Sequence, residues 1–244
     1  MTLISNFFLT NKIDLQKKFD FPINYSFSNK RKTISIQIYN HSIKVIAPTW
    51  TSKSTIQKFI LKNEKWITKQ IKLKVEEEKI RKTFCHNETF KILDKNYILK
   101  IVEGNNNKPK IIDTQSIILV CSNDKNNNSF IKNEIIKIYK AKAEEILFYK
   151  TEYFSRLIGE KPKSVKIKDY KSRWGSCSSK KIISYNWRII MAPIEIVNYL
   201  VVHELCHLIH FNHSKSYWHE VEKNLPKYKE YRKWLKLNGH KLTI

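Results

Sequence analysis

The chain is poor in the residues that build flexible linkers, with only four glycines and six prolines among 244 residues. We therefore expect no long flexible linker, and this length suits either one large domain or two small ones. Twelve phenylalanines and twelve tyrosines, within a hydrophobic content of 41%, are enough to build a packed core.

Long apolar runs and paired cysteines are missing as well. No stretch approaches the roughly 20 apolar residues of a membrane span, so we expect no membrane partner. The first sixteen residues lack a basic leader and a sustained apolar run, so we expect no secretory signal. Cys85, Cys121, Cys177 and Cys206 show no paired spacing, which predicts free thiols in a reducing, cytoplasmic setting and argues against a four-cysteine zinc site.

Acidic residues are also scarce. Lysine and arginine total 46 against 22 aspartates and glutamates, a formal net charge of +24. Such a charge favours anionic ligands, and nucleic acid is one candidate partner. The lysines are spread along the chain and do not form one block, so a compositional bias towards lysine, asparagine and isoleucine is the favoured explanation of the charge.

The apolar patterning predicts a mixed α+β fold. Alternation predicts short strands at 23–27, 33–38, 43–46, 89–93, 97–102 and 116–121. Helical spacing predicts one helix from a cap at Ser52 or Ser54 to about Arg81, and another over 130–158. Further along, strand-like and then helical segments are expected at 164–170, 173–177, 182–190, 194–211, 215–224 and 226–237.

The most informative motif is His203-Glu204-Leu205-Cys206-His207, which reads H-E-x-x-H. Residues four apart lie on one face of a helix, so His203 and His207 can point two imidazoles at one cation. Glu204 can then reach a water molecule bound to that cation, which is the zincin arrangement. The flanking residues are apolar almost all round, as in a buried helix. Buried polar groups without partners cost several kcal/mol, roughly, and a divalent cation satisfies all three residues together.

Three residues are candidates for a third metal ligand. His213 comes first, because it lies six residues after the second motif histidine, as in metzincins, although His210 replaces the metzincin glycine. Glu220 comes second, on a helix that starts near Ser214. The His210 side chain comes third, because it lies two turns beyond His203, roughly 10 Å along the helix axis.

Four more polar residues are candidates for supporting roles. Arg173 suits either the binding of anionic charge in the substrate or transition state, or a structural salt bridge. Asn186 either lines the cleft or caps a backbone group. Asn212 and Ser214 flank His213 and are expected to position its loop.

Several of these residues fall into a longer pattern. Its parts are Arg173-Trp174-Gly175-Ser176-Cys177-Ser178, Asn186-Trp187-Arg188, the segment around H-E-x-x-H, Asn212-His213-Ser214 and Tyr217-Trp218. In order and spacing they resemble the YgjP-like metal-dependent hydrolases, which are related to the SprT and Wss1-like metalloproteases. The resemblance covers most of the chain and is densest over 173–218. It implies zinc ligands at His203, His207 and His213 and a catalytic base at Glu204; Tyr217 stands where the family often has phenylalanine.

We therefore expect a metallopeptidase that uses one zinc ion per chain, a metal-activated water and Glu204 as general base to cleave peptide bonds. Residues 1–125 are expected to form an N-terminal α+β region with a long helix. Residues 126–244 are expected to form a zincin-like domain whose small sheet packs on the H-E-x-x-H helix. Two alternatives stay open in the sequence: a metal-dependent nucleotide phosphohydrolase, and a nucleic-acid-associated protein with a structural zinc. The pattern leaves the oligomeric state open.

Overall fold

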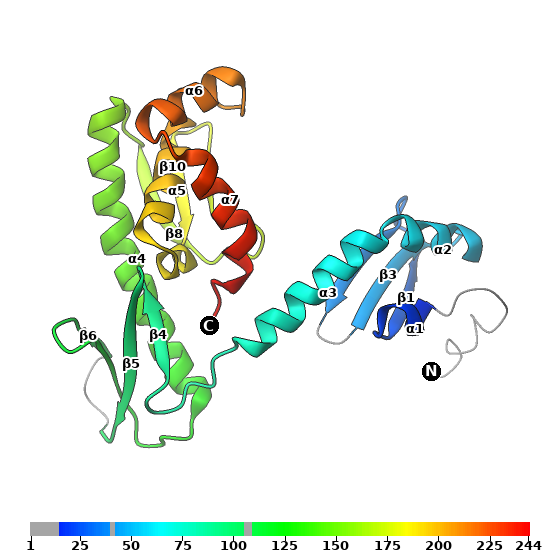
Figure 1. Ribbon diagram of the computed structural model, residues 1–244, viewed down its shortest axis with the longest axis horizontal. Helices are drawn as coiled ribbons and strands as arrows, with labels where there is room; N and C mark the ends of the chain where they lie inside the picture. Colours follow the sequence, from blue (N-terminus) through cyan, green and yellow to red (C-terminus); the bar gives the residue numbers. More distant parts are fainter. Residues whose placement is uncertain (1–14, 40–41, 105–108) are drawn as a thin grey trace. The chain divides into compact units, whose positions relative to one another are not determined.

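The computed structural model describes residues 15–39, 42–104 and 109–244 (Figure 1). The chain divides into two compact units after Ile80. The domain boundary predicted between residues 125 and 126 lies inside the second unit and stays a prediction. The segment for which we expect no secretory signal falls mostly in residues 1–14, outside the described ranges. None of the helices in the described ranges is both long and apolar enough to cross a membrane.

The first unit is a three-stranded sheet with helices packed on it, as the strand patterning predicts. Its strands have the order β1-β3-β2, with β1 and β3 parallel and β2 and β3 antiparallel. The elements are α1 (Leu15–Phe19), β1 (Ile23–Ser28), β2 (Ser35–Tyr39) and β3 (Ser42–Pro48). Alternate residues of β3, namely Ile43, Val45 and Ala47, are buried in the core of this unit, because successive strand side chains point to opposite faces.

The single helix predicted from Ser52 to Arg81 is wrong in one respect, because the structure has two helices there. They are α2 (Lys53–Lys62) and α3 (Glu64–Lys79). Ser52 caps the first, and its hydroxyl accepts a hydrogen bond from the Thr55 backbone N–H at 3.2 Å. Asn63 separates them, and its side-chain amide donates to the Phe59 carbonyl at 2.8 Å. Such a local side-chain bond competes with the regular helix pattern.

The second unit begins with a four-stranded sheet of order β4-β5-β7-β6 and a long helix. These elements are β4 (Thr89–Ile92), β5 (Lys95–Val102), β6 (Lys110–Ile112), β7 (Ile117–Cys121) and α4 (Asn128–Ile158). The strand β6 was not predicted, because three residues are too few to show a period. The helix α4 starts where the Asn127 side chain accepts from the Phe130 N–H at 3.0 Å, and it ends at Gly159, whose φ of +82° suits glycine.

A second, smaller sheet supports the site. Its strands have the order β8-β10-β9 and are β8 (Ser164–Lys168), β9 (Gly175–Cys177) and β10 (Ile182–Asn186). The strand predicted over 182–190 is therefore wrong beyond Asn186, where the 3₁₀ helix η1 (Trp187–Met191) begins. The Asn186 side chain accepts a hydrogen bond from the Arg188 N–H at 3.2 Å, so it caps η1 and ends the strand.

The helix that carries the motif lies at the centre of the second unit. The C-terminal elements are α5 (Ile194–Cys206), α6 (Lys215–Asn224), α7 (Tyr228–Asn238) and η2 (Gly239–Lys241). Figure 1 shows α5 between α4 and α7, and it also contacts α6 and β9. The fold is thus mixed α+β, with the predicted small sheet packed on this helix. The helix predicted to run to 211 ends at Cys206, and Phe211 is 65% exposed.

Candidate metal centre

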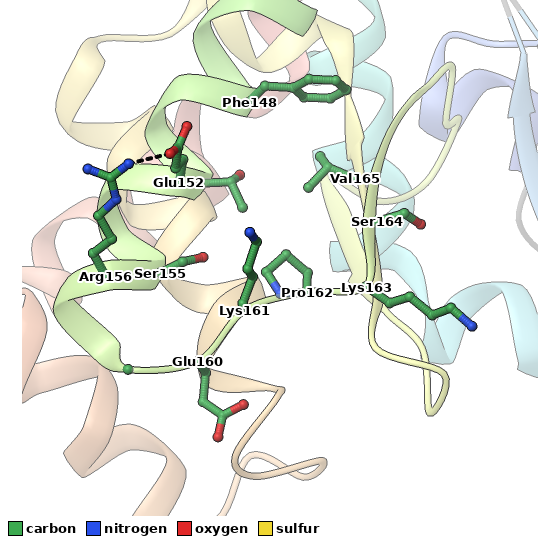
Figure 2. A pocket seen from close by; sticks show the side chains of 12 residues that line it. Phe148, Glu152, Ser155, Arg156, Glu160, Lys161, Pro162, Lys163, Ser164 and Val165 are labelled. Atoms are coloured by element: carbon green, nitrogen blue, oxygen red, sulfur yellow. Dashed lines mark hydrogen bonds and ion pairs between the residues drawn. The ribbon is translucent and has the colours of Figure 1, made fainter.

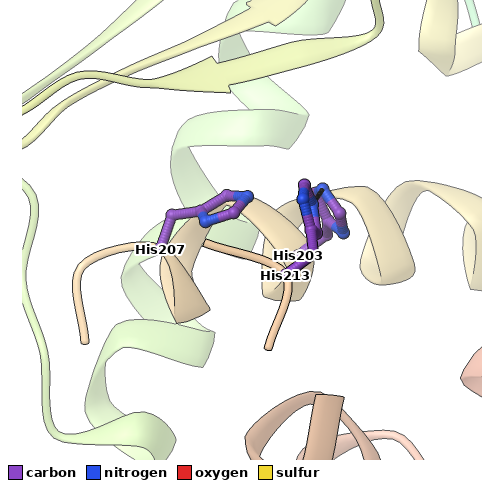
Figure 3. Close-up of side chains that lie close together, drawn as sticks. All are labelled: His203, His207 and His213. Carbon is purple, nitrogen blue, oxygen red and sulfur yellow. Dashed lines mark hydrogen bonds between the residues drawn. The ribbon is translucent and has the colours of Figure 1, made fainter. Parts of the chain in front are cut away.

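Three imidazoles converge at the end of α5 (Figure 3). His203 lies in the last turn of α5, His207 is the residue that ends it, and His213 returns in the loop before α6. Their ligand atoms all lie within 4.8 Å of one another, and the Nε2 atoms of His203 and His213 are 3.3 Å apart. The structure therefore places His213, the first-ranked candidate for the third ligand, beside the two histidines of the motif.

The other two ligand candidates have different positions. Among the residues that the structure describes, the group that could hold a metal ion contains neither Glu220 nor the His210 side chain. The Glu220 carboxylate accepts a hydrogen bond from the Asn224 side chain at 3.2 Å. His210 contributes its backbone instead, because its carbonyl oxygen lies 3.0 Å from Nδ1 of His207.

The contact with His210 defines which nitrogen of His207 carries the proton. A carbonyl oxygen only accepts hydrogen bonds, so Nδ1 of His207 must be the donor. In a neutral imidazole this leaves Nε2 without a proton, and that nitrogen is then free to bind a cation. Holding the distal ring nitrogen in this way orients a ligand and makes it a better donor to metal.

Burial keeps the three imidazoles neutral. Burial, together with the neighbouring His207 and His213, lowers the pKa of His203 to about 3. The pKa values of His207 and His213 are also lowered, again mainly by burial. Neutral imidazole is the form that coordinates metals, so this cluster needs no deprotonation step to bind one at neutral pH.

Glu204 lies beside the cluster with its carboxylate packed against β9. The residue is 3% exposed, and burial raises its pKa to about 8, while the nearby charge of Arg173 acts in the opposite direction. A Cβ atom at Gly175 would lie only 2.4 Å from Oε1 of Glu204 and 2.8 Å from its Cγ. Gly175 therefore makes the space in which this carboxylate sits. The sequence analysis did not predict this role. The chain has only four glycines, so each of them could have indicated a position where a side chain does not fit.

The loop before β9 is held by Asn186. Its side-chain amide donates to the carbonyl oxygens of Tyr170 and Arg173, at 2.9 and 3.2 Å. Because its side-chain oxygen is also bonded, to the Arg188 N–H, these contacts favour a positioning role. The Arg173 guanidinium lies over the Tyr170 ring, 5.6 Å from the centroid. Substrate contact by Arg173 or Asn186 stays a prediction.

The two residues that flank His213, Asn212 and Ser214, have different environments. Asn212 is exposed. Ser214 caps α6, since its hydroxyl accepts a hydrogen bond from the Tyr217 N–H at 3.3 Å. The cap therefore starts the helix that places Tyr217, a fully buried residue, against the imidazoles. The hydroxyl of Tyr217 lies 2.7 Å from Nδ1 of His203, a contact that the sequence analysis did not predict.

One pair of imidazoles in the cluster has the spacing that zinc ligands require. Zinc–nitrogen bonds of roughly 2.0–2.1 Å in tetrahedral geometry place two ligand nitrogens about 3.3 Å apart. The Nε2 atoms of His203 and His213 have that separation. Three neutral nitrogen donors leave a fourth coordination position open for water, as in catalytic zinc sites. The residues present therefore suit the ion.

A separate pocket lies beside the C-terminal end of α4 (Figure 2). Its volume is about 740 Å³, and its lining includes Phe148, Ser155 and Lys161. An ion pair between Glu152 and Arg156 crosses one wall. The residues that line it include no member of the histidine cluster. We therefore assign the chemistry to the cluster at the end of α5.

Comparison with known proteins identifies the family of this chain. The sequence profile of the family described as YgjP-like, metallopeptidase domain, matches residues 32–238. A search of curated proteins gave no match. Among solved structures, the chain is similar to the metallopeptidase zymogen abylysin of Pyrococcus abyssi, with 28% identity, 37% of this chain and 94% of that chain covered, and a TM-score of 0.34. Because the family profile spans most of the sequence, including all three histidines, the chain belongs to the YgjP-like metallopeptidase family.

Proposed function

We propose that this metal-dependent peptidase uses one zinc ion, held by His203, His207 and His213, and that Glu204 is its general base. The observation that carries the proposal is the convergence of three neutral imidazoles beside a buried carboxylate. The expected substrates are proteins or peptides, in keeping with the family. We also propose a cytoplasmic location, and a division of labour in which residues 126–244 carry catalysis and residues 1–125 form an accessory region.

Each residue has a defined task in this proposal. His203 and His207 direct Nε2 towards the metal, because their Nδ1 atoms are hydrogen-bonded to the Tyr217 hydroxyl and the His210 carbonyl. A bound zinc ion supplies Lewis acidity, which lowers the pKa of coordinated water to roughly 7 and polarises a carbonyl. Burial raises the pKa of Glu204 to about 8, which makes its carboxylate a stronger base. In this proposal the carboxylate accepts a proton from the attacking water and passes it to the leaving amine. Arg173 is the candidate donor for the charge that develops on the substrate.

Replacing Glu204 with glutamine tests the assigned base. The E204Q change keeps size and polarity but removes the proton-accepting carboxylate, so we expect the folded protein to bind zinc and lose turnover. The measurement is cleavage of a labelled unfolded protein, together with elemental analysis and thermal unfolding. Glu220→Gln is the matched control on α6 and should leave cleavage unchanged. Turnover by E204Q at the parental rate would show that the mechanism is wrong.

A substrate panel separates the proposal from the phosphohydrolase alternative. Phosphoanhydride chemistry usually recruits carboxylate-held magnesium or two metal ions. The candidate group in the described part of the chain consists of histidines alone, which supports the peptidase. We expect zinc-loaded protein to cleave unfolded proteins and peptides and to leave nucleoside triphosphates intact. A purely structural zinc in a nucleic-acid-binding protein predicts no turnover of either class and binding that weakens steeply with salt.

A further inference from the structure

Tyr217 makes a contact with the metal centre that packing does not require. Its hydroxyl lies 2.7 Å from Nδ1 of His203 and also donates to the backbone carbonyl of the same residue at 2.9 Å. The side chain is fully buried, on α6, which starts at the Ser214 cap. One hydroxyl thus bonds both to the ring and to the backbone of a candidate zinc ligand.

The direction of these two bonds follows from proton counting. A phenol at neutral pH has one hydrogen to donate, and the His203 carbonyl oxygen can only accept. The Tyr217 hydrogen is therefore used in the bond to the carbonyl. The bond to the ring must then run the other way, with Nδ1–H of His203 donating to the phenol oxygen. A neutral His203 in this arrangement has no proton on Nε2, the atom that faces His213.

We propose that Tyr217 is a positioning residue whose hydroxyl holds His203 as the Nδ1–H tautomer and so directs its Nε2 lone pair into the metal site. The proposal rests on the metal centre of the proposed function but concerns a residue outside its ligand set. The His203 carbonyl fixes the position of the Tyr217 hydroxyl, because this carbonyl belongs to the backbone of α5. His210 has the corresponding task for His207, through its carbonyl oxygen.

The ring of Tyr217 has a second, purely steric role that must be separated from the first. It stacks on His207, with ring centroids 4.5 Å apart, and meets His213 edge-on at 4.8 Å. Phenylalanine keeps these ring contacts and removes only the hydroxyl. The change Tyr217→Phe therefore isolates the hydrogen bonds, and loss of such a partner behind a ligand typically weakens metal binding about 10–100-fold.

The experiment uses the full-length protein in two states. In the metal-free protein, nitrogen chemical shifts from ¹H–¹⁵N NMR report the tautomer of His203, and we expect the Nδ1–H form in the parent and a mixture of tautomers in Y217F. In the zinc-loaded protein, competition with a chelator measures affinity, and we expect Y217F to bind about 10–100-fold more weakly.

Tyr199→Phe is the matched control. Tyr199 is buried on α5 with its ring 5.8 Å from that of His203. Within residues 15–39, 42–104 and 109–244, its hydroxyl makes no hydrogen bond to a histidine. Y199F should leave tautomer and affinity unchanged. If Y217F keeps the Nδ1–H tautomer and parental zinc affinity, the inference is overturned. If the parent shows the tautomer but has no peptidase activity, the proposed function fails while the role of Tyr217 stands.

Discussion

A single methyl group at Gly175 should disable the proposed general base without touching a proposed metal ligand. In Gly175→Ala the new Cβ would lie 2.4 Å from Oε1 and 2.8 Å from both Cγ and Cδ of Glu204. Ordinary carbon contacts are about 3.5–4.0 Å, so the carboxylate must withdraw by about 1 Å. Glu204 is 3% exposed, so little free space surrounds it and the shift must be shared with β9.

The expected consequence is a loss of catalysis that exceeds the loss of stability. A displacement of about 1 Å in a reacting group costs on the order of 10²-fold in rate. Overpacking of this kind lowers the free energy of unfolding by roughly 1–3 kcal/mol. Cleavage of a fluorescently labelled unfolded protein, measured on samples of equal zinc content, reports the first quantity. Denaturation with urea reports the second.

Gly239→Ala is the control for added volume. Its Cβ would lie 3.1 Å from the Trp174 ring and does not meet Glu204. We expect a small change in stability and cleavage within about twofold of the parent, because the displacement needed is only a few tenths of an ångström. If zinc-loaded Gly175→Ala cleaves substrate as fast as the parent, the packing of Glu204 against β9 does not position the base, and the reasoning fails.

Two further predictions concern pH and the loop before β9. Burial lowers the pKa of His203 from 6.5 to about 3, so between these values the unfolded chain binds more protons than the folded one. Glu204 acts in the opposite direction, because burial raises its pKa from 4.5 to about 8 and the folded chain binds the extra proton between these values. The free energy of unfolding of the metal-free protein should therefore fall most clearly as pH drops from 4.5 towards 3, where Glu204 is protonated in both states, and a flat series of urea curves over that range would contradict this. Asn186→Ala removes the donor to two loop carbonyls, at a cost of roughly 1–3 kcal/mol. Thermal unfolding should show the loss, and activity should fall with it because Arg173 is released; an unchanged melting temperature would refute it.

Much of the fold was predictable because its signals are local. The alternation of apolar residues predicted a strand at β3, and their helical spacing predicted the helix α4. Both predictions are confirmed. Two of the errors have the same physical origin. Asn63 interrupts a helix and Asn186 ends a strand through bonds from their side chains to the backbone, and apolar periodicity contains no information about such bonds.

In the candidate site, too, the local features were predictable and the contacts between distant segments were not. The spacing of His203, Glu204 and His207 could be interpreted without a structure, because residues on one helix face are neighbours by geometry. Gly175 and Tyr217 could not be placed in the same way. Their importance comes from contacts across space, from β9 to the Glu204 carboxylate and from α6 to the ring of His203.

The three proposed zinc ligands lie close together along the chain, which has a thermodynamic consequence. His203 and His213 are separated by ten positions, so the loop that joins the outer ligands is short. Closing a short loop costs little entropy, and each doubling of its length adds only about 0.6 kcal/mol. The denatured chain therefore keeps much of its affinity for zinc. Since binding to the denatured chain offsets stabilisation of the native one, zinc should raise the melting temperature less here than in a site assembled from distant segments.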